Sequence, residues 1–346
     1  MNLHLLIPAL FWPEASLHEI YRDLSLPALE SLLARSLCTI DEVYAIEAWL
    51  CHAFGIPKQY DWPVAPITLQ MDAGEKLKTE YDYWLRADPV HLRIERDQIV
   101  LADSRIFQIS ADEAGQFTDM LNKHFAENAQ EISFLPLRPD RWYLHITKTP
   151  PPQTHLLSEV ANKGIRELLP FGTNSMNWRG LFNEIQMLLH EHSLNQSRED
   201  RGDLAVNSTW FWGGGVMPAS VVCPYTHVWS NDVLTESLAL ASATDHAQLP
   251  NDAAAWYQSA VSGNHLVVLN PLHGKAQYAD VYGWRESLKE LEQKWFGSLW
   301  AMLKQGKFNR LTLTALGTNK TKNFILTRHD SRKFWRRAKP LHLLAE

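Results

Sequence analysis

The chain has 346 residues, of which 45% are hydrophobic and 21% charged, and its formal net charge at pH 7 is −6. This composition excludes a disordered or fibrous protein, and the acidic balance argues against non-specific nucleic-acid binding by the whole chain. At about 100–200 residues per domain, the length predicts two domains, or one large domain with an insertion. The three scattered cysteines exclude a disulfide framework and a zinc motif, and they indicate a reducing cytoplasm. No apolar run reaches the roughly 18 residues of a membrane span, and the apolar start lacks the features of a secretory signal.

The N-terminal part of the chain predicts one buried strand and two helices. The apolar residues before Pro8 have the pattern of a short, fully buried strand. Leucines at helical spacing follow Pro27, which is tolerated in the first turn of a helix because the N–H that it lacks has no partner there. The expected elements are a strand over 3–7, helices over 26–36 and 41–54, and a proline-rich loop over 57–74.

The segment 82–149 has the pattern of a separate α+β unit. Ser110 lies three residues before Glu113, which is the spacing of a capping box at the start of a helix. The expected order is strands over 91–95 and 98–102, a helix over 111–125, and strands over 132–135 and 142–146. Because these elements bury a small core of their own, we expect an inserted domain, which the stiff run 149–152 connects to the rest of the chain.

Helices and strands alternate after Pro170. The expected elements are helices over 178–192, 232–243 and 284–303, and strands over 208–212, 266–269 and 310–315. Buried strands separated by helices predict a mostly parallel sheet with helices on both faces. The predicted fold class is therefore α/β, with a core formed by residues 1–81 and 150–346 and a smaller α+β cap domain at 82–149. Ligands of such sheets bind at the carboxyl ends of the strands.

Two groups of residues have the chemistry of an anion site. The glycines at 213–215 follow a predicted buried strand, where backbone N–H groups could hold an anion and Arg198 could supply a guanidinium. The alternative is a tight turn without a ligand. In the inserted unit, Arg93, Arg105 and Arg141 could close over an anionic substrate, or they could be solvated charges on strand edges.

The C-terminal segment 320–339 is strongly basic, with eight Lys or Arg residues and one Asp. Phe334 and Trp335 lie among the basic residues, and this combination is found in proteins that bind single-stranded nucleic acid or an acidic partner. The alternative is a basic helix that neutralises an acidic body.

Several sequence segments resemble those of a known family. The chain resembles the RpfE-type regulatory proteins of proteobacteria (regulator of pathogenicity factors) along its whole length. It is more distantly similar to the archaeal-type cofactor-independent phosphoglycerate mutases of the alkaline phosphatase superfamily. The strings that carry the first resemblance are 84–92, 141–144, 183–190 and 207–215. The second resemblance rests on the order of segments, and it implies an alkaline-phosphatase-like core with an inserted cap.

The sequence departs from that superfamily at the positions of its chemistry. The superfamily uses two divalent metals and a Ser or Thr nucleophile. The resemblance implies that a metal-binding aspartate follows the strand 3–7, that further Asp and His ligands follow the strands 266–269 and 310–315, and that the nucleophile precedes a helix at 48–55. At those places this chain has Pro8-Ala9, Asn270-Pro271-Leu272-His273, Ala315-Leu316 and Tyr44-Ala45. Alanine, proline and leucine side chains offer no lone pair to a metal, so only His273 could still act as a ligand.

We therefore predict a catalytically degenerate member of the superfamily, with no catalytic residue, no metal site and no cofactor. Its expected role is regulatory, through a phosphorylated or otherwise anionic metabolite or through a protein partner. The residues predicted to bind the ligand are Arg93, Arg105, Arg141, Asn195, Arg198, Asn207, Gly213, Gly214 and Gly215. One alternative is an active phosphoglycerate mutase or phosphohydrolase with relocated metal ligands. Another is nucleic-acid binding through the basic tail.

Overall fold

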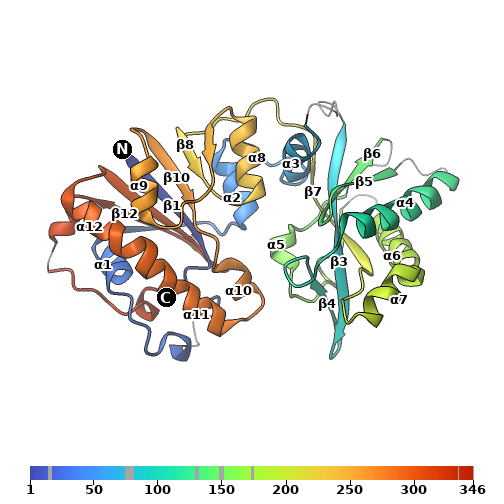
Figure 1. The fold of residues 1–346 in the computed structure, drawn as a ribbon, viewed down its shortest axis with the longest axis horizontal. Helices are drawn as coiled ribbons and strands as arrows, with labels where there is room; N and C mark the ends of the chain where they lie inside the picture. The colour runs from blue at the N-terminus through green and yellow to red at the C-terminus, as the bar shows by residue number, and fades with distance from the viewer. Residues whose placement is uncertain are drawn as a thin grey trace. The chain divides into compact units, whose positions relative to one another are not determined.

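The structure, a computed structural model, divides the chain into two compact units (Figure 1). Unit 1 comprises Met1–Phe54 and Val222–Glu346, and unit 2 comprises Gly55–Val221. The residues that the structure describes are 1–14, 18–74, 82–128, 132–147, 152–172, 175–333 and 335–345.

The core of unit 1 is a sheet of seven strands. Their order across the sheet is β2 (Leu37–Asp41), β12 (Thr321–Thr327), β11 (Arg310–Leu316), β1 (Asn2–Pro8), β10 (Asn264–Val268), β8 (His227–Trp229) and β9 (Asp245–Ala247). The five strands from β11 to β9 run parallel to one another. Strand β12 is antiparallel to both β11 and β2, which leaves β2 at the edge. The predicted mostly parallel sheet is therefore confirmed, with an antiparallel strand near one edge.

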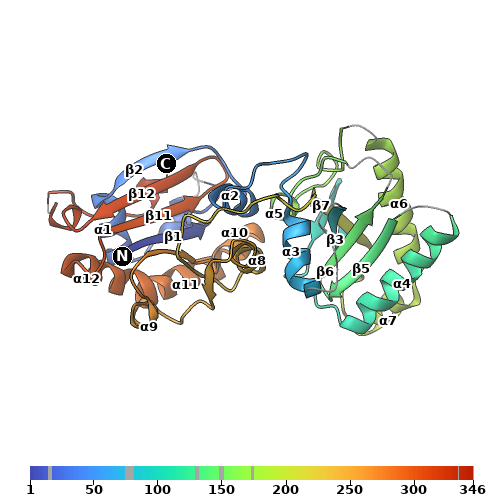
Figure 2. The same ribbon diagram turned by 90° about the horizontal axis from the view of Figure 1, so that it is seen from above.

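Helices cover both faces of this sheet. Leu5 and Ile7 of β1 belong to a buried cluster with Trp284 and Leu299, whereas the ring of His4, which points to the opposite face, meets Trp49. Figure 2 shows α9, α11 and α12 along one side of the sheet. The helices of unit 1 are α1 (Pro27–Arg35), α2 (Ile46–Ala53), α8 (Val233–Ala241), α9 (Ala253–Ser259), α10 (His273–Gln277), α11 (Val281–Leu291), a π-helical turn (Glu292–Phe296), α12 (Gly297–Gln305) and α13 (His342–Ala345), with 3₁₀ turns at His18–Tyr21 and Asp330–Arg332. The α/β class predicted from the sequence is confirmed.

Unit 2 contains an antiparallel sheet in which β3 is the central strand. The strands are β3 (Tyr83–Glu95), β4 (Gln98–Ala102), β5 (Ile132–Arg138), β6 (Arg141–Ile146) and β7 (Ser208–Gly215). Strand β3 pairs with β4, β6 and β7, and β6 pairs with β5. The helices are α3 (Val64–Ala73), α4 (Ala111–Glu127), α5 (Leu157–Val160), α6 (Ser175–Glu191) and α7 (Ser193–Asp200). The predicted capping box is present at the start of α4, where Ser110 accepts from the backbone N–H of Glu113.

The structure differs from the sequence predictions in several places. The predicted strand 208–212 was expected in the parallel core, but β7 pairs antiparallel with β3 in unit 2. An apolar run predicts a buried strand without specifying which sheet contains it. The predicted loop 57–74 contains α3, because Pro66 lies in its first turn, where a missing N–H costs nothing, and Val64, Ile67 and Leu69 are buried.

The predicted domain boundaries at 82 and 149 also differ from the ends of unit 2. Unit 2 begins at Gly55 and ends at Val221 because α3 and β7 both pack against β3. Residues 81 and 149–151, which include most of the predicted connector 149–152, lie outside the described residues.

Candidate functional site

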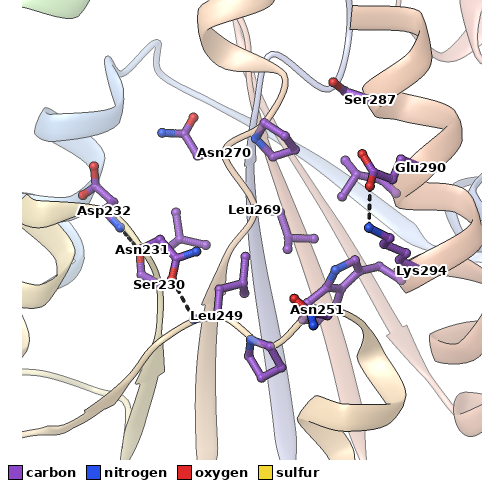
Figure 3. Close-up of a pocket in the computed structure, with 15 residues that line it drawn as sticks. Ser230, Asn231, Asp232, Leu249, Asn251, Leu269, Asn270, Ser287, Glu290 and Lys294 are labelled. Atoms are coloured by element: carbon purple, nitrogen blue, oxygen red, sulfur yellow. Dashed lines mark hydrogen bonds and ion pairs between the residues drawn. The ribbon is translucent and has the colours of Figure 1, made fainter. Parts of the chain in front are cut away.

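A cavity of about 430 Å³ lies at the carboxyl ends of β8 and β10 in unit 1 (Figure 3). Strand β8 ends at Trp229, and the chain then passes through Ser230 and Asn231 to Asp232, which caps α8. Strand β10 ends at Val268 and leads to Asn270. The carboxyl edge of a parallel sheet is where α/β folds bind ligands, and a volume of a few hundred Å³ suits a small molecule.

The wall after β8 is held by its own hydrogen bonds. The backbone N–H of Asp232 donates to Ser230 Oγ (2.8 Å), and the Asp232 carboxylate accepts from the backbone N–H of Thr235 (2.9 Å). Asn231 Oδ1 accepts from the backbone N–H of Leu249 (3.0 Å). These contacts fix the direction of the Asn231 side chain and leave its amide nitrogen, within the described part of the chain, with no hydrogen-bond partner.

The opposite wall comes from α11 and the π-helical turn, and Figure 3 shows Ser287, Glu290 and Lys294 on that side. Lys294 Nζ forms an ion pair with Glu290, so its charge is already balanced. Buried Leu269 lies between the two walls. No hydrogen bond is found among the described residues for the side chains of Asn251, Asn270 and Ser287. The cavity therefore offers uncommitted amide and hydroxyl groups over an apolar floor.

The neighbouring strand ends in unit 1 are aliphatic. The backbone N–H of Ala9, directly after β1, donates to the carbonyl of Leu316 at the end of β11 (2.9 Å). Ala9 and Leu316 have no side-chain donor atom for a metal. Among the described residues, no three His, Cys, Asp or Glu side chains are close enough together to hold a metal ion. The residues at these strand ends do not fit the two-metal centre that the family resemblance implies.

All the residues predicted to bind an anion lie in unit 2, and three of them, Arg93, Arg105 and Arg141, have carboxylate partners. Arg93 pairs with Glu95 (2.5 Å), and Arg105 Nε donates to Asp103 (2.8 Å). Arg141 donates twice to Asp72, at 2.8 and 2.9 Å. Burial alone would raise the pKa of Asp72, but hydrogen bonds from Arg141 and Tyr143 outweigh burial and lower it to about 2.

Arg198 and the two asparagines connect segments of the backbone. Arg198 is 1% exposed, donates to the carbonyls of Leu204 (2.8 Å) and Gln108 (2.6 Å), and pairs with Glu113 (3.0 Å). Asn195 bonds both backbone groups of Val206, and Asn207 bonds both backbone groups of Leu92. These contacts hold residues 204–207, which lead into β7, against α7 and β3.

The three glycines lie within β7 and not in the loop that the sequence predicts. A Cβ at Gly214 would lie 2.5 Å from side-chain atoms of Leu85 and Tyr83, and one at Gly215 would lie 2.6 Å from Pro63 Cβ. Gly213 has a φ of +66°, in the left-handed region. The glycines therefore allow close packing inside unit 2. The role of the whole predicted set in binding an anion stays a prediction.

The residues around the cavity were not selected from the sequence as ligand-binding residues. Two of them could have been found from their position in the sequence, because Asn270 directly follows a predicted strand and Asp232 begins a predicted helix. Asn251 and Ser287 carry no such signal, because the cavity gathers them from separate helices and loops.

The basic C-terminal segment does not form the helix considered above. Its first part is β12, followed by a 3₁₀ turn at Asp330–Arg332. Lys333 pairs with Asp330 (2.5 Å), and Arg336 donates to the carbonyl of Ser36 (2.8 Å). Trp335 is 66% exposed, and Phe334 lies outside the described residues. Nucleic-acid binding by this segment stays a prediction.

No protein-family model matches the sequence, and no curated protein shows significant similarity to it. One similar solved structure is the cofactor-independent phosphoglycerate mutase from Thermoplasma acidophilum DSM 1728, with 15% identity, a TM-score of 0.45, and coverage of 94% of this chain and 89% of that one. Another is the PH0037 protein from Pyrococcus horikoshii, with 12% identity, a TM-score of 0.50, and coverage of 94% and 87%. We base the fold similarity on the Pyrococcus structure, because the TM-score of the Thermoplasma structure is below 0.5. In the part of the chain that the structure describes, no helix is both long and apolar enough to cross a membrane.

Proposed function

We propose that this chain is a regulatory, ligand-binding protein on a phosphoglycerate-mutase-like fold that does not carry out two-metal phosphoryl transfer. The observation that carries the proposal is the pair of strand ends at Ala9 and Leu316, whose side chains cannot coordinate a metal. The resemblance of the strings 84–92 and 207–215 to the RpfE-type regulatory proteins supports the same role. The rival proposal is an active mutase or phosphohydrolase whose metal ligands lie elsewhere.

The cavity at β8 and β10 is the proposed ligand site. Its charged groups are the carboxylates of Asp232 and Glu290 and the ammonium of Lys294, so an anion would meet a net negative charge. Uncommitted amides and a hydroxyl form directional hydrogen bonds with neutral groups. We therefore propose a small hydroxylated ligand there, in place of the phosphorylated metabolite that the sequence predicts.

The absence of mutase chemistry is tested with the purified full chain. Interconversion of 2- and 3-phosphoglycerate is measured with and without added Mn²⁺, and bound metal is quantified in parallel. We expect no turnover above the buffer rate. Two tightly bound metal ions together with turnover would establish the rival function.

Ligand binding is tested by thermal shift with matched pairs of compounds, namely glucose, ribose and glycerol and the phosphate ester of each. A ligand that binds only the folded state raises the melting temperature. We expect a neutral compound to raise it for the wild type and not for Asn270→Ala, while Asn319→Ala, an exposed asparagine in the turn before β12, behaves as wild type. A shift with phosphate esters alone would contradict the proposed ligand class and favour the arginines of unit 2.

A further inference from the structure

A second cavity, of about 450 Å³, lies at the same carboxyl edge of the unit 1 sheet, beside β2 and the start of β12. Asp41 ends β2 and is paired in register with Thr321, which begins β12. The side chains that matter for its chemistry are Asp41, Glu42, Tyr44, Trp49, His52 and Thr321. None of them belongs to the cavity at β8 and β10.

The two fully charged groups in this cavity are carboxylates. Asp41 Oδ2 accepts from Asn323 Nδ2 (2.6 Å), and neither Asp41 nor Glu42 has an ion-pair partner among the residues that the structure describes. Helix α2 begins nearby without a side-chain cap, and its N-terminus contributes roughly half a positive charge. Two full negative charges outweigh that half charge, and Lys320 and Lys322, the neighbours of Thr321 in the sequence, do not line the cavity, so its lining favours a cation.

Aromatic rings form another part of the wall. Tyr44 and His52 stack with ring centroids 5.6 Å apart and an interplanar angle of 28°. The indole of Trp49 packs edge-on against His4, with centroids 5.4 Å apart. These contacts hold the rings in place beside the carboxylates. Aromatic faces next to carboxylates are the combination by which proteins bind ammonium groups.

Thr321 supplies an independent indication of a ligand. Its side chain is 1% exposed, and its Oγ1 has no hydrogen-bond partner among the described residues. A buried polar atom without a partner costs about 1–3 kcal/mol, and natural proteins seldom leave one unsatisfied. Thr321 is one of the residues that line the cavity, and its hydroxyl oxygen is free to accept a hydrogen bond from an N–H group.

We propose that this cavity binds the protonated amino group of a small primary amine. The ammonium N–H groups donate to Thr321 Oγ1 and to the free oxygens of the two carboxylates. The alkyl part of the ligand lies against the rings of Tyr44 and Trp49. Because a quaternary ammonium has no N–H to donate, the site prefers a primary amine.

Calorimetric titration of the full chain at pH 7 tests the site with three probes of similar size: n-butylammonium, tetramethylammonium and butan-1-ol. We expect n-butylammonium to bind at least tenfold more tightly than either of the others. Equal binding of butan-1-ol would overturn the electrostatic basis of the proposal. Equal binding of tetramethylammonium would overturn the role of Thr321, and no binding of n-butylammonium would overturn the whole proposal.

Substitutions then test which side chains bind n-butylammonium. Asp41→Asn and Glu42→Gln should each weaken n-butylammonium binding at least tenfold, and Thr321→Val at least threefold. Glu236→Gln, which removes an exposed carboxylate on α8 outside the cavity, should leave the affinity unchanged. Because Glu42 is exposed, its variant should keep the wild-type melting temperature, and unchanged affinity in that folded variant would contradict the site.

Discussion

The indole Nε1 of Trp284 donates a hydrogen bond of 2.9 Å to the carbonyl oxygen of Ala9, the residue directly after β1. Trp284 is fully buried, and the rings of Trp12 and Tyr21 both meet it edge-on at 5.6 Å. Ala9 has a φ of +56°, which an alanine adopts only when its surroundings impose it. The end of the first strand is therefore held by an aromatic cluster, at the place where the resemblance implies a metal-binding aspartate.

Replacing Trp284 with Phe should lower the free energy of unfolding by about 1–3 kcal/mol, because the Ala9 carbonyl loses its donor and the smaller ring leaves a void. Urea titration measures the change. Trp300→Phe is the control, since Trp300 is only partly buried and packs against Arg35, and it should change stability by less than about 0.5 kcal/mol. Equal losses in the two variants would contradict the role assigned to the Trp284 hydrogen bond.

Arg198 and Arg93 should respond differently to replacement by alanine. Arg198 is buried against Glu113 and two backbone carbonyls, so Arg198→Ala should cost about 3–5 kcal/mol by leaving these groups unpaired. Arg93 and Glu95 are both partly exposed, and Arg93→Ala should cost less than about 1 kcal/mol. Chemical unfolding followed by circular dichroism measures both. A stable Arg198→Ala variant would instead favour the ligand-binding role predicted from the sequence.

Local patterns in the sequence predicted many helices and strands, because each such pattern is contained within a short segment. The capping box at Ser110 and the apolar strand at 3–7 are examples, and both are confirmed. Strand β2 was missed because all five of its residues are exposed, so it has no hydrophobic alternation. Helix α3 was missed because Pro63, its N-cap, and Pro66, in its first turn, are typical of loops, although both lie where a helix tolerates a proline.

The site was harder to predict because its contacts join residues that are distant in the sequence. Arg141 resembles a free anion-binding residue until the structure places it beside Asp72, which lies 69 residues earlier. The rule that ligands bind at the carboxyl ends of strands directed attention to the segment after 266–269, where Asn270 lines the cavity. It gave no information on Asn251, because β9, the strand that precedes it, was not predicted, or on Ser287, which lies within α11.

Asp72 should make the stability of unit 2 depend on acid pH. Its pKa in the folded protein, about 2, lies below the usual 3.8, so the folded state binds a proton less readily than the unfolded state. The stabilisation is therefore complete above about pH 4 and is lost as the pH falls towards 2. Asp72→Asn should be less stable than the wild type at pH 6, and the difference should shrink at pH 2.5. Urea titrations at the two pH values measure it, and a constant difference would contradict the prediction.

His4 should give a second pH dependence, in a higher range. Its Nε2 lies 2.7 Å from Thr314 Oγ1, which donates to Asn323, so the histidine must donate at Nε2. Its Nδ1 lies 2.8 Å from the hydroxyl of Tyr225 and can accept from it, which describes a neutral ring. Burial, assisted by the positive charge of Arg310, lowers the pKa of His4 from 6.5 to about 4.

Because this folded-state pKa lies below the unfolded value, the unfolded state takes up the proton first as the pH falls. The contribution of His4 to stability is therefore present above about pH 6.5 and is lost on the way to pH 4. Between pH 7 and 4.5, the wild type should lose about 2 kcal/mol more than His4→Gln, whose amide can still donate to Thr314. Asn319→Ala, at an exposed position, should keep the wild-type dependence. If His4→Gln loses as much stability as the wild type in urea titrations at the two pH values, His4 is not the neutral histidine that its hydrogen bonds describe.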